Sequence, residues 1–336
     1  MRRLSFRSLP LLALLLVAAC AGPGASPTSA PTLAPTATAA PTITAAPTAA
    51  GITIIDDEGT TTVLPAVPET IVSLTPATTE LLFTLGVGEK LAGRTDFDDY
   101  PPEALDAPAV ATFAGVNVEQ VVDIDPDLVI AGGNNFTPPG DVSRLRDLDI
   151  PVIVIYAPDL DGVLADIRLV GLAVGAQEAA EGVVGDIQAR IDEVTAAVGG
   201  LERPRTFYEI GDTPEIYGPA PDSFVEDMVS IAGGSAITTT DPQVFAIPLE
   251  QLVTADPEVI VLGDAAYGTC PDNVVTRPGW AGITAVQDGQ IRPVDDIIVT
   301  RPGPRLGEGL AALALAIHPD AEIEPPTAGT EYCPTL

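Results

Sequence analysis

Hydrophobic and polar positions alternate most regularly over residues 177–198. Apolar side chains recur there at intervals of three or four, as at Val183, Ile187 and Ile191, with charged residues between them. This periodicity predicts one amphipathic helix, about 33 Å long at 1.5 Å per residue. Two glycines at 199–200 mark its end. A helix of this length is longer than a single small lobe needs.

A second pattern occurs once on each side of this helix. Residues 118–132 and 249–263 each read as a short helix, an Asp-Pro turn and a buried strand. The two copies keep a constant offset of 131 residues, measured from Glu119 to Glu250. The repeat therefore predicts two related lobes, one before and one after the long helix.

Apolar runs of strand length alternate with helical patterns in both halves of the chain. The expected strands are 71–74, 91–94, 128–131 and 152–156 before the long helix, and 206–210, 259–262 and 291–294 after it; a hairpin is expected at 52–64. Such alternation is typical of parallel sheets covered by helices. The sequence predicts an α/β fold, with two Rossmann-like lobes joined by a single long backbone helix.

The N-terminus carries the features of an export signal. Three arginines precede an apolar run at residues 9–19, too short for a membrane span, and Cys20 follows Val17-Ala18-Ala19. This arrangement resembles a bacterial lipobox, so we expect Cys20 to be acylated and to anchor the protein to the cell membrane from the extracytoplasmic side. An ordinary signal peptide that precedes a cysteine by chance is the alternative.

Composition divides the chain into five expected parts. Residues 21–50 consist mainly of Pro, Thr and Ala and contain no charge, which predicts an extended tether. We assign 1–19 to a signal peptide, 20–50 to the lipid-anchored tether, 51–175 to the N-terminal lobe, 176–200 to the interlobe helix, and 201–336 to the C-terminal lobe and tail. The net charge of −32 argues against a nucleic-acid partner.

Cysteine and histidine content limits the possible chemistry. Cys270 and Cys333 remain after Cys20, and in an exported protein such a pair is expected to form a disulfide. The only histidine, His318, stands at a predicted helix end, where a capping role is expected, so a directly bound metal ion is not expected. The chain has no Gly-x-Ser-x-Gly motif, and we expect no enzyme activity. A cell-wall interaction protein is an alternative that the Pro/Thr stalk suggests.

Short motifs in a fixed order carry a family resemblance. They are Ser73-Leu74-Thr75-Pro76, Asp99-Tyr100-Pro101-Pro102, Asn117-Val118-Glu119-Gln120, Ile231-Ala232-Gly233-Gly234, Arg301-Pro302-Gly303-Pro304-Arg305 and Ile317-His318-Pro319. With them the chain resembles the cobalamin and ferric-siderophore class of ABC-importer substrate-binding proteins over about residues 52–319. The first lobe is especially similar to cobalamin-binding proteins. The resemblance implies a cleft between two lobes that binds a transported metal chelate: cobalamin, a ferric siderophore or haem.

The resemblance also implies particular site residues, on loops at the carboxyl ends of the strands. The implied ligand-binding residues are Phe97, Phe113, Asn135, Phe136, Tyr208, Tyr217, Asp296 and Arg301. Phe113 takes the place of a tryptophan of cobalamin binders, and a second such position falls at Gly132. Arg301 would meet a carboxylate or the charge of a ferric complex, whereas Asp98 is expected to be a solvated loop acid. For haem, Tyr208, Tyr217 or Tyr267 would be the axial ligand.

The repeat, together with the family resemblance, also indicates which partner proteins to expect. In the family, one glutamate in each lobe meets arginines of the membrane subunits, and Glu119 and Glu250 occupy that place here. The implied partners are an ABC permease dimer and its ATPase, with a monomeric binding protein. No resident cofactor is expected, because the chelate is cargo.

Overall fold

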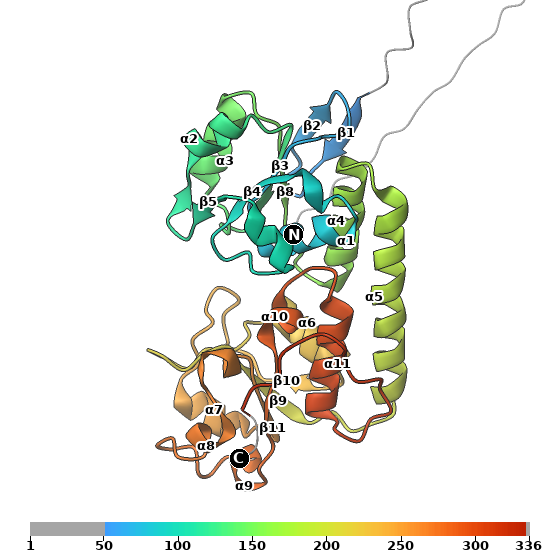
Figure 1. The fold of residues 1–336 in the computed structure, drawn as a ribbon. Coiled ribbons are helices and arrows are strands. Elements are labelled where there is room, and N and C mark those ends of the chain that lie inside the picture. The colour runs from blue at the N-terminus through green and yellow to red at the C-terminus, as the bar shows by residue number, and fades with distance from the viewer. Residues whose placement is uncertain (1–50, 334–336) are drawn as a thin grey trace, which may run out of the picture. The chain divides into compact units, whose positions relative to one another are not determined.

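The long amphipathic helix is present as α5, Gln177–Val198, and connects the two halves of the fold (Figure 1). The structure, a computed structural model, describes residues 51–333. Helix α5 packs against α4, Leu160–Ala173, of the first lobe and against α11, Leu306–Ile317, of the second. Both lobes belong to one compact unit of the chain. The prediction of two α/β lobes joined by one long helix is confirmed.

Lobe one contains a six-stranded sheet in the order β6-β5-β4-β3-β7-β8. Its strands are β3 Ile71–Ser73, β4 Leu91–Thr95, β5 Ala109–Thr112, β6 Gly115–Val116, β7 Leu128–Gly132 and β8 Val152–Ile155. Its other helices are α1 Pro76–Thr84, α2 Val118–Ile124 and α3 Pro139–Asp147, with 3₁₀ turns at Gly88–Lys90 and Pro102–Asp106. Neighbouring strands are parallel except β5 and β6. All five residues of β7 are buried, as expected for a strand covered on both faces.

Lobe two contains a four-stranded parallel sheet in the order β10-β9-β11-β12. Its strands are β9 Arg205–Glu209, β10 Ser235–Ala236, β11 Val259–Leu262 and β12 Ile291–Pro293. Its helices are α6 Phe224–Ile231, α7 Leu249–Ala255, α8 Pro271–Val274, α9 Thr284–Gln287, α10 Asp296–Thr300 and α11, with a 3₁₀ turn η3 at Ala265–Tyr267. Helix α10 replaces an expected loop, because Asp295 accepts the backbone N–H of Ile297 and caps a helix too short to show periodicity.

The repeated segments adopt the same local structure in both lobes. Helices α2 and α7 each have seven residues and end at an aspartate in the left-handed region, Asp125 with φ 54° and Asp256 with φ 49°. Aspartate tolerates that conformation better than most residues, and the following proline prevents the helix from continuing. Buried strands β7 and β11 follow. Glu119 and Glu250 both lie in the first turn of their helices and are exposed.

The N-terminal hairpin covers the free edge of the lobe-one sheet. It consists of β1, Ile52–Ile55, and β2, Thr61–Leu64. Its turn bonds to edge strand β8: Asp57 N–H donates to Val154 O at 3.1 Å, and Val154 N–H donates to Asp56 Oδ2 at 3.0 Å. Beyond the strand, Tyr156 N–H donates to Asp57 Oδ2 at 2.5 Å. Covering an edge in this way prevents it from pairing with other chains.

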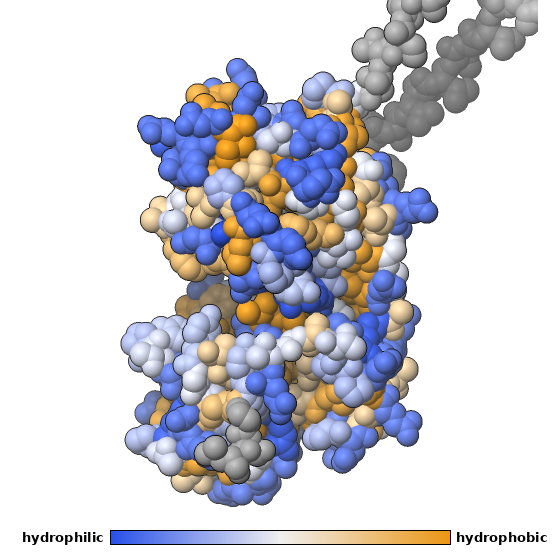
Figure 2. Space-filling view, in the orientation of Figure 1, coloured by the Kyte–Doolittle hydropathy of each residue, from blue (hydrophilic) through white to orange (hydrophobic). Residues whose placement is uncertain are grey.

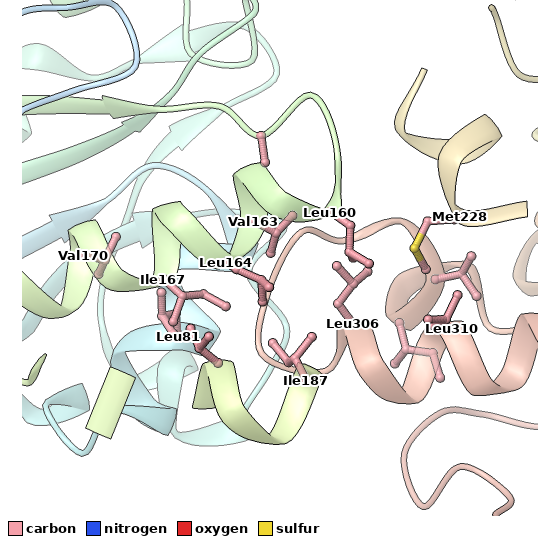
Figure 3. Close-up of a cluster of buried hydrophobic side chains, with 14 of the residues drawn as sticks. Leu81, Leu160, Val163, Leu164, Ile167, Val170, Ile187, Met228, Leu306 and Leu310 are labelled. Carbon is pink, nitrogen blue, oxygen red and sulfur yellow. The ribbon is translucent and has the colours of Figure 1, made fainter. Parts of the chain in front are cut away.

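One hydrophobic cluster extends through both lobes and the connecting helix. Figure 3 shows side chains of α1, α4, α5, α6 and α11 in this cluster, among them Leu81, Ile167, Ile187, Met228 and Leu310. Because α5 contributes buried residues to the same cluster as α4 and α11, the two lobes are not separated by a flexible linker. No helix among residues 51–333 is long and apolar enough to span a membrane.

Two single-residue predictions can be compared with the structure. Cys270 and Cys333 form a disulfide, as predicted, and join the C-terminal tail to the loop that precedes α8. His318 is the C-cap residue of α11, and its Nε2 lies 3.1 Å from the carbonyl oxygen of Gly233, just after α6. The histidine thus contacts the end of a neighbouring helix.

Candidate functional site

Two arginines of lobe two contact carboxylates of lobe one. Arg305 makes a bidentate pair with Glu80, with Nε–Oε1 2.7 Å and Nη2–Oε2 2.9 Å, and Glu80 is only 2% exposed. Its guanidinium also lies 4.0 Å from the centre of the Tyr100 ring. Arg301 donates from both terminal nitrogens to Asp99 Oδ1 at 3.1 Å. These contacts tie the lobes together beside the cleft.

A pocket of about 520 Å³ lies between the lobes. Lobe one contributes the start of α1 and the segments after β7 and β8; lobe two contributes the start of α6 and the end of α10. The lining residues are Thr75, Pro76, Ala77, Gly132, Gly133, Asn134, Asn135, Phe136, Ile155, Tyr156, Ala157, Asp166, Phe224, Thr300, Arg301 and Pro302. In Figure 2 a hollow between the lobes has hydrophobic residues in its depth. The pocket lies at strand carboxyl ends, where open α/β sheets generally bind ligands.

Three phenylalanines of lobe one form an aromatic cluster that continues into this pocket. The Phe97 and Phe113 rings are stacked, with centroids 4.5 Å apart, and Phe136 meets Phe97 edge-on at 5.8 Å. Phe113 is 89% exposed and Phe136 51% exposed. Exposed aromatic rings gathered at a cleft are typical of a binding surface. The structure therefore brings together three of the residues expected at the site.

Gly132 has no room for a side chain. An added Cβ would lie 2.7 Å from Thr75 Cγ2 and 2.9 Å from Phe136 Cδ1, closer than real Cβ atoms come. The Phe136 ring thus fills the space next to Gly132, where the family resemblance implies a tryptophan in cobalamin binders. The turn that places it contains Asn134 and Asn135 in the left-handed region, with φ 50° and 63°. Asn135 is exposed and lines the pocket.

The residues that were expected at the site from lobe two, Tyr208, Tyr217 and Asp296, do not line the pocket. Tyr208 is fully buried, and its hydroxyl donates to Asp296 Oδ1 at 2.7 Å, so it lies beneath the site and does not form its wall. Burial, reinforced by the charge of Asp296, raises the pKa of Tyr208 well above its usual value. Burial also raises the pKa of the half-buried Asp296. Tyr217 is half-buried, forms bridges with Gly211 and Ala246, and does not line the pocket.

Two charged residues differ from expectation. Arg301 lines the pocket, but it pairs with Asp99 and lies 3.6 Å from Glu80, so it is not an unpaired cation awaiting a ligand. The expectation that Asp98 is a solvated acid is wrong, because Asp98 is 1% exposed. Its carboxylate accepts hydrogen bonds from the hydroxyls of Thr79 and Thr95. Burial raises the pKa of this carboxyl, and the two hydrogen bonds oppose that effect.

Lobe two carries a network of charged residues that sequence reasoning missed. Arg277 makes a bidentate pair with the buried carboxylate of Glu209, at 2.6 and 2.8 Å, and also contacts Asp212 at 2.9 Å. At the end of β11, Asp264 is buried and accepts the Thr269 hydroxyl at 2.7 Å, and burial raises its pKa. Arg277 and Glu209 are 68 residues apart, and no local pattern links them. Clusters of His, Cys, Asp or Glu fit for a metal ion are absent from residues 51–333.

A second missed residue, Asp166 of α4, lies in the pocket wall. It is 8% exposed. Burial is the largest cause that raises the pKa of Asp166, to about 8. The charge of Asp57 and a hydrogen bond with the Asp57 carboxyl add to this effect. A sequence signal existed: Asp166 stands three residues after Val163 and four before Val170, on the apolar face of its helix. An acid on such a face is unusual unless its carboxyl has a partner or a function.

Comparisons with known proteins agree with this architecture. The profile of the periplasmic binding protein family matches residues 71–297. The ABC transporter substrate-binding lipoprotein YvrC of Bacillus subtilis is 32% identical over 274 residues, covering 80% of this chain and 86% of that protein. A cobalamin-binding protein of Halobacterium salinarum is 30% identical over 283 residues, covering 80% and 74%. The crystal structure of a periplasmic haem-binding protein from Pseudomonas aeruginosa is 25% identical with a TM-score of 0.67, covering 80% of this chain and 100% of that one.

Proposed function

The chain belongs to the periplasmic binding protein family, and we propose that the ligand it carries is a corrinoid of the cobalamin type. Members of this family are substrate-binding proteins, not enzymes. They bind a ligand outside the cytoplasm and work with the permease and ATPase of an ABC importer. The fold, the interlobe pocket and the family place this chain in that role, and the remaining question is the chemistry of the ligand.

The stacked phenylalanines of lobe one are the observation that carries the proposal. The exposed Phe113 ring is stacked on the half-buried Phe97 ring, and Phe136 extends this aromatic cluster into the pocket. Aromatic rings bind flat apolar faces well, both by excluding water and by offset or edge-on contact. A corrin or porphyrin macrocycle offers such a face, whereas a small inorganic ion does not.

Charge then favours a neutral macrocycle over an anionic one. Arg305 is paired with Glu80, Arg301 with Asp99, and Arg277 with Glu209, so each of these arginines already has a counter-charge. An anionic ligand would have to break one of these pairs or enter an acidic environment uncompensated. The periphery of cobalamin consists mainly of neutral amides, which hydrogen-bond without such a cost. Haem carries two propionates, and many siderophore complexes are anionic.

Haem is the second candidate, because one tyrosine of the pocket is suited to bind iron. Tyr156 lines the pocket and is half-exposed, and its hydroxyl accepts a hydrogen bond from Asn134 Nδ2 at 3.3 Å. The tyrosines expected from sequence are less suitable, since Tyr208 is buried against Asp296 and Tyr267 is almost fully exposed. A phenolate oxygen can serve as an axial ligand of haem iron.

Titration calorimetry and absorbance with a ligand panel test the proposal. We expect heat on adding cyanocobalamin, and about tenfold weaker binding by Phe113→Ala, because a ring lost from a stacked contact costs about 1.4 kcal/mol. Phe245→Ala removes another exposed phenylalanine and serves as the control, with unchanged affinity. A Soret band with haemin and no heat with cyanocobalamin would assign haem instead. Binding of ferric siderophores alone would overturn both macrocycle readings.

The attachment to the membrane is a separate proposal. Cys20 lies outside the described residues, and its support is the lipobox-like sequence together with the similarity to a Bacillus subtilis lipoprotein. We infer that acylated Cys20 anchors a monomeric binding protein next to its permease. Wild-type protein should fractionate with membranes, and Cys20→Ala should be released from them. Equal membrane association of the two proteins would exclude the anchor.

A further inference from the structure

The segment that follows α11 runs back over the fold. We call residues 322–333 the strap; in Figure 1 it is the dark red stretch after α11. Its start is held on the connecting helix: the Glu324 N–H donates to Glu193 Oε1 of α5 at 2.7 Å, and the Glu324 carbonyl accepts a hydrogen bond from Arg190 of the same helix. The side chain of Ile323 is 7% exposed and belongs to the main hydrophobic cluster. The strap therefore begins at a fixed point on α5.

The middle of the strap contacts the first turn of α10, the five-residue helix beside the pocket. Thr330 N–H donates to Asp295 Oδ2 at 2.7 Å, while the other oxygen of Asp295 caps α10 by accepting the Ile297 N–H at 3.0 Å. Gly329 lies against the same helix with φ 107°, and an added Cβ would come within 2.8 Å of Ile298 Cδ1. A glycine allows both this backbone conformation and this close approach. The Asp295 carboxylate thus joins the strap to α10.

The end of the strap is fixed by a covalent bond. Cys333 forms the disulfide with Cys270, which precedes α8. Tyr332 and Cys333 are partly buried and pack against the lobe-two hydrophobic cluster that includes Trp280. Fixing both ends of a segment lowers the entropy lost when the contacts between those ends form. With one end on α5 and the other in the disulfide, the strap is held against α10.

The other end of α10 forms part of the pocket wall. Thr300 and Arg301 both line the pocket, and Arg301 pairs with Asp99 of lobe one at 3.1 Å. A helix of five residues is not stable by itself, so its position depends on the groups around it. Helix α10 packs on α6 and α11, buries Ile298 and Val299 in the main hydrophobic cluster, and bonds to the strap. A shift of its first turn therefore moves the Arg301 end as well.

We propose that the strap, fixed by the Cys270–Cys333 disulfide, positions the lobe-two wall of the pocket for ligand binding. Asp295 and Gly329 are positioning residues, since they set the place of α10 and neither lines the pocket. The proposal rests on the proposed function in one respect, because the ligand is taken to occupy the interlobe pocket. The disulfide then has a role beyond holding the tail: it keeps the Arg301 side of the pocket in place.

Amide hydrogen exchange of the ligand-free protein tests the local effect. Cys270→Ser/Cys333→Ser releases the end of the strap, and Gly329→Ala pushes the strap away from α10 while the disulfide stays intact. In both variants we expect the α10 amides of residues 299–301 to exchange about tenfold or more faster than in wild type, because a hydrogen bond to the Asp295 carboxylate is lost. Gly289→Ala is the matched control: this lobe-two glycine also has a positive φ, 66°, but an added Cβ meets nothing within 4 Å. Its α10 amides should exchange as in wild type.

The pattern of exchange separates positioning from general stability. Strands β9 and β11 lie in the centre of the lobe-two sheet, so their amides report on the opening of the whole lobe. If the α10 amides exchange faster only in proportion to those of β9 and β11, the strap stabilises the lobe without positioning α10, and the proposal is wrong. Circular dichroism verifies that each variant is folded.

Titration with cyanocobalamin tests the effect on the pocket. Both strap variants should bind it severalfold more weakly than wild type, and Gly289→Ala should bind it equally well. Faster exchange in α10 with unchanged affinity would overturn the positioning role and leave the corrinoid proposal intact. If wild type does not bind cyanocobalamin, the proposed function fails, and the same titration with haemin or the ferric siderophore that wild type does bind decides the role of the strap.

Discussion

The two lobes share a topology but carry different side chains at the carboxyl ends of their strands. At the strand ends of lobe one lie the exposed ring of Phe113, the half-exposed ring of Phe136 and the glycines after β7. At the strand ends of lobe two lie Glu209, the last residue of β9, and Asp264 after β11, both buried. Each lobe has a parallel sheet, and each contains one copy of the helix, Asp-Pro turn and strand. The two lobes share this scaffold and differ in the loops at the ends of their strands.

This difference assigns separate tasks to the two sides of the site. Lobe one offers an aromatic surface for a flat apolar face, whereas the acids of lobe two are buried and partnered within the lobe, Glu209 by Arg277 and Asp264 by Thr269. Function here depends on the side chains attached to a common fold, since the same sheet supports either surface. Where the lobes meet, lobe one supplies the acids, Glu80 and Asp99, and lobe two supplies the arginines that pair with them. The interlobe contacts thus combine opposite charges.

The largest effect is expected from breaking the buried interlobe pair. Glu80→Gln removes the counter-charge of Arg305, and losing one partner of a buried pair costs about 3–5 kcal/mol. Asp99→Asn breaks the neighbouring pair with Arg301, whose acid is mostly exposed, and should cost less than about 1 kcal/mol. Urea unfolding of the two variants measures the difference. Equal effects would mean that burial of Glu80 does not control the interlobe contact.

A pH-dependent effect should come from Asp166. Its pKa is about 8 in the folded protein, against an ordinary value of 3.8. The folded protein therefore holds this proton more tightly than the unfolded chain, and stability falls as the pH rises from about 4 to about 8, with the loss complete above pH 8. Asp166→Asn removes this dependence, so its gain in unfolding free energy over wild type should grow by up to about 4 kcal/mol between pH 5 and pH 8.

The measurement is thermal or urea unfolding at several pH values. Asp161→Asn, at an exposed position of the same helix, should show a difference from wild type that does not change over this range. A gain by Asp166→Asn that is the same at pH 5 and pH 8 would contradict the raised pKa of Asp166. The result also bears on the difference between the lobes, because Asp166, from lobe one, is the one acid among the residues that line the pocket.

The fold was predictable because its signals are local. The spacing of apolar residues over 177–198 fixed α5 to the residue, and the repeat located α2 and α7 with the strands that follow them. Helix α10 was missed, since five residues are too few to show a period. The aromatic residues Phe97, Phe113 and Phe136 were expected at the site from the family resemblance, and the structure brings them together.

The electrostatics of the site were not predictable, because they depend on distant partners. Asp98 looks like a loop acid, but it is buried by contacts that include Thr79, 19 residues away. Arg301 was expected to await a ligand, yet its counter-charge, Asp99, lies 202 residues earlier in the chain. Asp166 is the exception, since an acid on an apolar helix face is visible in the sequence alone. Its pairing with Asp57 of the hairpin, however, required the structure.

The smallest energetic effect per residue is expected at a position that the two lobes have in common. Glu119 and Glu250 occupy the same first-turn position of α2 and α7, and both are exposed. We propose that they dock the protein onto the two membrane subunits of the permease, so that the repeat in the protein matches the twofold symmetry of the transporter. Exposed charge pairs contribute only about 0–1 kcal/mol each, and they act mainly on the rate and orientation of encounter.

Charge reversal separates docking from ligand binding. Glu119→Arg and Glu250→Arg should each leave affinity for the ligand unchanged, because neither residue lines the pocket. Each should lower the stimulation of the importer's ATPase in reconstituted vesicles severalfold, and the double variant should lower it further, with effects that weaken at high salt. Glu178→Arg/Glu202→Arg reverses two other exposed acids and should stimulate like wild type. If the Glu119→Arg/Glu250→Arg protein also stimulates like wild type, the shared glutamates reflect the common structure of the repeat and have no role in docking.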